Sequence, residues 1–110
     1  MQIHIPDEKL DNFLAYLALG VLHAIQRGVV PPTTGISTLG MPKLWMPMMD
    51  IAAVPREILD VFQIADELQL LQELAPALFD SKLTALIKRS EVELAKTVDP
   101  TWGQWEITPD

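Results

Sequence analysis

The chain has 110 residues, of which 49% are hydrophobic and 21% are charged, and it contains no cysteine. This length and composition predict one globular domain with a single core, and the lack of cysteine excludes disulfides, thiolate metal sites and thiol nucleophiles. Fifteen acidic and eight basic residues give a net charge of −7 at pH 7. Such a chain repels the phosphate backbone, so nucleic acid is not an expected partner.

The N-terminal residues predict a short extended segment, residues 1–6, that leads into a helix. Apolar and polar residues alternate over the first five positions, and Pro6 ends the alternation. Asp7 is expected to cap the following helix, and Gly28 is expected to end it. The start of the chain has neither the basic residues nor the small-residue cleavage site of a secretory signal, so we expect a cytoplasmic protein.

The stretch 7–27 is the most hydrophobic part of the sequence and predicts the central helix of the fold. Residues 13–25 carry no formal charge, but this run is too short to cross a bilayer, which takes about twenty residues. Apolar residues cover nearly all of the helix surface, which is typical of a helix with neighbours on several sides. Gly20 in its interior is expected to allow a close helix crossing. The expected buried face is Leu10, Phe13, Leu14, Leu17, Val21, Ala24 and Ile25.

The segment 33–54 predicts short helices and loops, because its glycines and prolines leave room only for short helical turns. It also contains Trp45 and a cluster of methionines. Methionine is flexible and polarizable, so such a cluster can form an adaptable recognition surface. The plainer interpretation is that these side chains fill gaps beneath an irregular connection. The methionines are Met41, Met46, Met48 and Met49.

The segment 55–75 predicts an acidic amphipathic helix or a pair of helices. Pro55 is expected at the first helical position. The sequence leaves open whether the helix continues through Asp66 or whether Asp66 caps a second helix that begins at Glu67. The side expected to be buried is Ile58, Val61, Phe62, Ala65 and Leu68, and the opposite side is Glu57, Asp60, Gln63 and Glu67.

The segment 77–97 predicts the last helix, with a buried apolar side and an outer face of mixed charge. The residues available for burial are Leu78, Leu83, Leu86, Ile87, Val92 and Leu94. The charged residues of the outer face are Lys82, Lys88, Arg89, Glu91, Glu93 and Lys96.

The tail, residues 98–110, is too short and too rich in glycine and proline to form a substantial helix. It contains Trp102 and Trp105. Two arrangements are open. Either the tryptophans fold back onto the bundle, with residues 104–108 pairing with residues 2–5 as a minimal ribbon, or they contact a partner.

These segments together predict an all-α fold in one domain. We expect a compact bundle of four to six helices around a buried first helix, with a short extended N-terminus and a C-terminal tail.

No pattern in the sequence indicates catalysis. The chain has no glycine-rich phosphate loop, no nucleophile elbow and no HExxH pair. Its two histidines, His4 and His23, are nineteen residues apart and do not form a metal-binding pair. We therefore expect no cofactor, no metal site and no enzymatic activity.

Apolar residues spaced around glycine and proline recur from the first helix to the start of the last one. They are Leu19-Gly20-Val21-Leu22, Ala24-Ile25, Gly28-Val29-Val30, Ile36, Leu39, Ile58-Leu59, Ile64-Ala65, Glu67-Leu68, Leu74 and Pro76. This pattern, over about residues 10–90, resembles a family of short bacterial helical domains without assigned function. The methionine-rich segment and the tryptophan tail depart from that family. In type, the small, acidic, cysteine-free chain is also similar to immunity proteins that neutralise bacterial toxins.

Acidic residues concentrate between residues 50 and 80, where Arg56 is the only base. An acidic helix face complements the basic cleft of a nuclease, so the expected function is that of an immunity protein bound to a basic toxin domain. The alternative is a homodimer or adaptor that uses the methionine and tryptophan surface. The expected partner-binding residues are Glu57, Asp60 and Glu67, then Asp66 and Glu73, with Trp45 or Trp102 as aromatic anchors.

Overall fold

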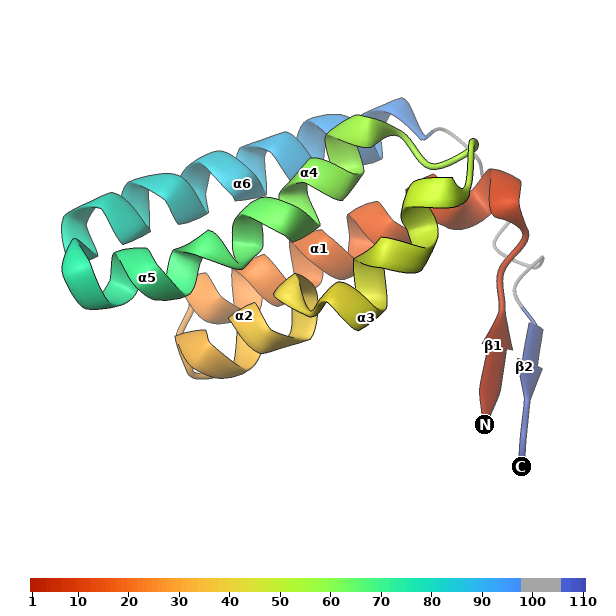
Figure 1. Ribbon diagram of the computed structural model, residues 1–110, viewed down its shortest axis with the longest axis horizontal. Coiled ribbons are helices and arrows are strands. Elements are labelled where there is room, and N and C mark those ends of the chain that lie inside the picture. Colours follow the sequence, from red (N-terminus) through yellow and green to blue (C-terminus); the bar gives the residue numbers. More distant parts are fainter. Residues whose placement is uncertain (98–105) are drawn as a thin grey trace.

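The computed structural model describes residues 1–97 and 106–110 and shows an all-α bundle with one small two-stranded ribbon (Figure 1). The fold class predicted from the sequence is confirmed. The α-helices of the described residues are α1 (Leu10–Gln26), α2 (Pro32–Gly40), α3 (Pro42–Trp45), α4 (Arg56–Ala65), α5 (Glu67–Leu74) and α6 (Pro76–Lys96). Two 3-10 helices, η1 (Asp7–Lys9) and η2 (Met46–Asp50), precede α1 and follow α3, and the strands are β1 (Gln2–His4) and β2 (Glu106–Thr108).

Helix α1 lies at the centre of the bundle, as predicted. It packs along α6 and also contacts α2 and α4, so three helices surround it. The buried face is rotated from the expected one by about 90°, counting 100° per residue. Because the helix is apolar nearly all round, its sequence does not distinguish the side that is most buried. The position of α6 determines that side. The buried residues of α1 are Leu14, Ala15, Ala18, Leu22 and Ile25, whereas Leu10, Phe13, Leu17, Val21 and Ala24 are half-buried.

The sequence predicted the C-terminal end of α1 correctly, but not its N-terminal end. Gly28 adopts a φ of 71°, and its N–H donates to the Ile25 carbonyl at 3.1 Å while the Val29 N–H donates to the Ala24 carbonyl at 2.9 Å. This is the expected glycine stop. The expected cap at Asp7 is wrong, because residues 7–9 form η1 and α1 starts after Lys9.

The sequence predicted a close helix contact at a glycine of α1. The structure shows such contacts at glycines of α2 instead. A Cβ at Gly20 would meet no atom within 4 Å, so the predicted close crossing at Gly20 is wrong. A Cβ at Gly35 would overlap the side chain of Ile25, and one at Gly40 would lie 3.1 Å from the Asp66 backbone. These two glycines bring α2 against α1 and against the junction between α4 and α5.

The acidic segment forms two helices, which settles the alternative left open by the sequence. Helix α4 ends at Ala65, α5 begins at Glu67, and Asp66 between them makes no side-chain capping bond. All five residues expected on the buried side of this segment are buried.

In α6, only some of the residues predicted to be buried or exposed are so in the structure. Leu83, Leu86 and Ile87 are buried, but Leu78 and Val92 are at least half exposed, so their expected burial is wrong. The helix is longer than its partner α5, which has only eight residues, and its neighbours cover one side only. Glu93 was expected on the outer face but is buried, and Lys96 donates to its carboxylate at 3.1 Å.

The two ends of the described chain form the predicted ribbon. Strands β1 and β2 pair antiparallel, with Ile3 opposite Ile107, and the ribbon extends away from the helices (Figure 1). Every residue of both strands is exposed. The expectations for Trp102 and Trp105 concern residues outside the described part of the chain.

Matched glycine substitutions test this packing. We expect Gly35→Ala to lower the free energy of unfolding, because the strain of overpacking, roughly 1–3 kcal/mol, outweighs the helix-propensity gain of about 1 kcal/mol. Gly20→Ala has open space and should raise the free energy of unfolding by up to about 1 kcal/mol. Urea titration followed by circular dichroism measures both. Equal effects of the two substitutions would contradict the close contact between Gly35 and Ile25.

Candidate functional site

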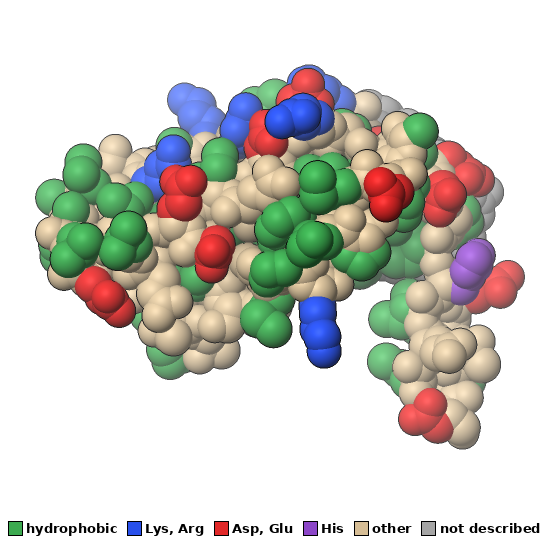
Figure 2. All heavy atoms as spheres, in the orientation of Figure 1, with side chains coloured by type: hydrophobic (Ala, Val, Ile, Leu, Met, Phe, Trp, Pro, Cys, Tyr) green, Lys and Arg blue, Asp and Glu red, His purple; other side chains and the backbone are tan. Residues whose placement is uncertain are grey.

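Glu57, Asp60 and Glu67, which were predicted to bind a partner, border different depressions of the surface. Glu57 borders a depression of about 160 Å³ together with Glu93 and Lys96, near the C-terminal end of α6. Asp60 borders a second depression beside η2, and Glu67 lines a groove between α5 and α6. Figure 2 shows acidic side chains spaced singly across this face of the bundle, with uncharged and hydrophobic side chains between them.

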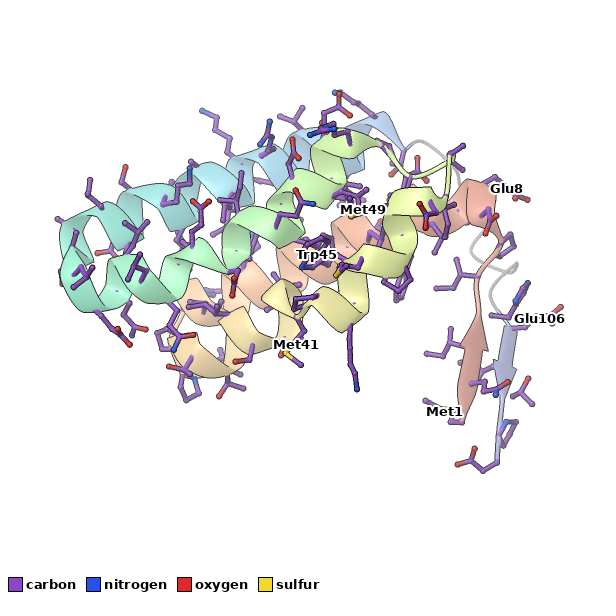
Figure 3. All side chains as sticks on the ribbon, viewed as in Figure 1. Met1, Glu8, Met41, Trp45, Met49 and Glu106 are labelled. Carbon is purple, nitrogen blue, oxygen red and sulfur yellow. The ribbon has the colours of Figure 1, made fainter. Side chains whose placement is uncertain are left out.

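The methionine-rich segment lies directly against α4. Helix α3 and η2 both contact α4, so two features that are separate in the sequence meet in one surface. Met41, Met46 and Met49 are each about half exposed, at 49%, 54% and 55%. Figure 3 shows Trp45 between Met41 and Met49 in this view of the surface.

Trp45 is fixed in place and is not a freely exposed anchor. Its indole Nε1 donates a hydrogen bond to the Gly40 carbonyl at 3.2 Å, and its ring is half-buried against the core. Met48 is likewise half-buried against the core. Part of the methionine cluster therefore fills the interior, as the plainer interpretation predicted, and the other side chains remain exposed. The recognition role of the exposed methionines stays a prediction.

A depression of about 220 Å³ separates η2 from α4. Its apolar walls are formed by Met49, Ile51, Ala52, Val54 and Leu59, and its polar side by Arg56, Asp60 and Gln63. The Arg56 Nε lies 4.0 Å from an Asp60 carboxylate oxygen, with the arginine side chain 90% exposed. An ion pair this open to water contributes little to stability, so either side chain is free to reorient toward a partner.

Two further acids border the exposed methionines. Asp50 ends η2 and is exposed, and exposed Asp66 packs its backbone against Gly40, next to Met41. Lys43 and Arg56 are the bases of the same elements. We call the whole region the α3–α4 surface; it comprises Met41, Lys43, Trp45, Met46, Met49, Asp50, Arg56, Asp60 and Asp66.

Sequence reasoning missed a second apolar surface. Leu70, Leu74 and Leu78, around the turn from α5 to α6, are 59%, 74% and 59% exposed. A helical wheel of α5 alone predicts this exposure. Counting 100° per residue, Leu70 and Leu74 lie about 110° around the helix from Leu68 and Leu71. Helix α5 contacts α6, α4 and α2, which bury Leu68 and half-bury Leu71 but leave Leu70 and Leu74 exposed.

No arrangement among the described residues indicates catalysis or metal binding. His23 is half-buried in α1, and the described part of the chain holds no group of three histidine or acidic side chains placed to bind a metal ion. In the depression beside Glu57, the carboxylate of Glu93 is paired with Lys96. Nor does any described helix combine the length and apolar character needed to span a membrane.

No protein-family model, curated protein or solved structure matches this chain. The resemblance to short bacterial helical domains therefore stays a prediction, and the function has to be argued from the surfaces themselves.

Two leucines of α5 test whether its outer face is a free surface. We expect Leu74→Gln to change the free energy of unfolding by less than about 0.5 kcal/mol, because the side chain is already in water. Leu68→Ala removes a completely buried side chain and should cost about 2–5 kcal/mol. Urea titration of both variants gives the comparison. A loss for Leu74→Gln as large as that for Leu68→Ala would place Leu74 in the core.

Proposed function

We propose that this protein is a non-catalytic binding protein, most concretely an immunity protein that docks a basic, nuclease-like toxin domain and occludes its active site. The observation that supports the proposal is the α3–α4 surface, which combines three exposed methionines and the acids Asp50, Asp60 and Asp66 with a depression lined by Met49 and Asp60.

The composition of this surface is that of a protein-binding site. Interfaces commonly have an apolar centre and a polar rim, and methionine adapts its shape to a partner at small cost. Here the methionines form the apolar part, and Trp45, held by its hydrogen bond to Gly40, is a rigid platform among them. In this proposal the apolar centre provides the contact area, and the polar rim orients the partner.

Charge supports a basic partner. A nuclease cleft is basic because it binds phosphates, and this chain carries a net charge of −7. Opposite charges speed the encounter of two proteins and suppress wrong partners. Glu57, Glu67 and Glu73 lie beyond the α3–α4 surface, so we assign them to this long-range attraction and assign contact to Asp50, Asp60 and Asp66.

The experiment that tests the proposal is affinity capture from the producing cells at low and at high salt, with mass spectrometry of the retained proteins. A basic nuclease that is retained at low salt, and whose purified activity this protein inhibits stoichiometrically, is the expected result. Retained proteins without an inhibited activity would reject the immunity role.

Charge-reversal variants test whether the partner contacts the α3–α4 surface. With the captured partner, we expect Asp50→Lys with Asp66→Lys to slow association about tenfold at low salt, because both acids border the docking site. The matched control is Asp7→Lys with Glu8→Lys, which changes the net charge equally at exposed positions of η1, outside the α3–α4 surface. Stopped-flow fluorescence measures both rates. Equal slowing in the two variants would show that the α3–α4 surface is not the contact.

The alternative function is self-association or a passive adaptor role through the same methionines. Sedimentation velocity distinguishes it, because Met46→Gln with Met49→Gln would then turn a dimer into a monomer. If the protein binds a nuclease instead, the same variant should leave the oligomeric state unchanged and raise the dissociation rate of the complex.

A further inference from the structure

A second surface lies at the end of the bundle where α5 turns into α6. Leu70, Leu74 and Leu78 are each more than half exposed, and Figure 2 shows hydrophobic side chains gathered over this end. A groove of about 380 Å³ runs between the two helices, and its walls are Glu67, Leu71, Leu78, Ser81, Lys82 and Ala85. A contiguous apolar patch of this kind on a soluble domain usually marks an interaction site.

The two helices differ in charge on the side that carries the leucines. The charged residues of α5 are Glu67 and Glu73, with Asp66 just before the helix. Helix α6 carries four of the eight bases of the chain together with Asp80, Glu91 and Glu93. Counting 100° per residue, Asp80 and Glu91 lie on the side of α6 opposite Leu78 and Lys82, and Glu93 is buried. In Figure 2 most of the basic side chains follow the edge formed by α6, where some acidic side chains lie among them, and further acidic side chains lie on the α4 and α5 side. The four bases are Lys82, Lys88, Arg89 and Lys96.

We propose that the hairpin of α5 and α6 is the interface of a homodimer, in which α5 of each copy packs on α6 of the other copy. On this surface α5 presents acidic side chains and α6 presents basic side chains on either side of an apolar centre, so the surface is complementary to itself. A foreign basic partner would meet repulsion from α6, and a foreign acidic one would meet repulsion from α5.

The charges also select the symmetry. In a twofold dimer the same patch is used by both copies. An axis parallel to the hairpin places α5 over α6 of the other copy, acid on base. An axis across the hairpin would place α5 over α5, acid on acid, which is unfavourable.

The residues that would pair lie at the same level of the hairpin. Glu67 is eight residues before Ala75 and Lys82 is seven residues after it. At 1.5 Å per residue, both are about 10–12 Å from the turn. An axis parallel to the hairpin preserves this level, so Glu67 of one copy meets Lys82 of the other. Within the described residues, neither side chain forms an ion pair in its own chain.

The inference is independent of the proposed function, because the α5–α6 groove and the α3–α4 surface share no lining residue. Such a dimer leaves the depression beside η2 open.

Charge-swapped variants of the full chain test the dimer by sedimentation velocity over a concentration series. The unmodified protein should dimerise, and Glu67→Lys or Lys82→Glu alone should weaken dimerisation about tenfold, because each variant creates two repulsive contacts. An equimolar mixture of the two variants should dimerise like the unmodified protein, since both contacts are then attractive again. The same rescue is expected for the double variant.

The matched controls are Glu57→Lys and Lys43→Glu, which change the same charges outside the groove. They should leave the dimer unchanged, and circular dichroism should show equal helix content for all variants. A monomeric unmodified protein would overturn the proposal. A mixture that fails to recover the dimer would also overturn the proposal. A dimer that is lost only with Met46→Gln and Met49→Gln would assign the interface to the α3–α4 surface instead.

Discussion

The packing of α1 against α6 is the contact on which the rest of the structure depends. These two helices are the longest, and completely buried Leu14, Ala15, Ala18 and Leu22 on α1 form the centre of the core. Burial of apolar side chains is the main favourable term in folding, so the remaining helices are positioned by the surface that this pair leaves uncovered. Helices α2 and α4 cover it, and α5 adds a short layer beside α6.

Close contacts at glycine then decide where the exposed surfaces lie. Gly35 brings α2 onto Ile25 of α1, and Gly40 brings the end of α2 onto the backbone of Asp66. The second contact directly precedes the methionine-rich segment, in which α3 and η2 contact α4 and Trp45 bonds the Gly40 carbonyl. The α3–α4 surface follows from backbone packing of α2, even though its side chains come from other elements.

The two surfaces differ in the physical argument they support. At the α3–α4 surface, exposed methionines and acids accompany a depression lined by Met49 and Asp60, which supports the proposal of a basic partner. At the hairpin of α5 and α6 both charges flank exposed leucines, which suits a copy of the same chain. Sequence position alone had grouped Glu57, Asp60 and Glu67 in one acidic face, whereas the fold places them beside three different depressions.

The sequence by itself determined the fold class, the central position of the first helix, its end at Gly28 and the buried side of α4, because apolar periodicity and glycine conformation are local properties. The pairing of the two chain ends was one of two arrangements that the sequence left open. Tertiary structure decided which side of α1 is buried, that Glu93 is inside while Leu74 and Leu78 are outside, and which acids neighbour the methionines. These outcomes depend on which helices pack together and how closely, and periodicity within one segment carries no information about its neighbours.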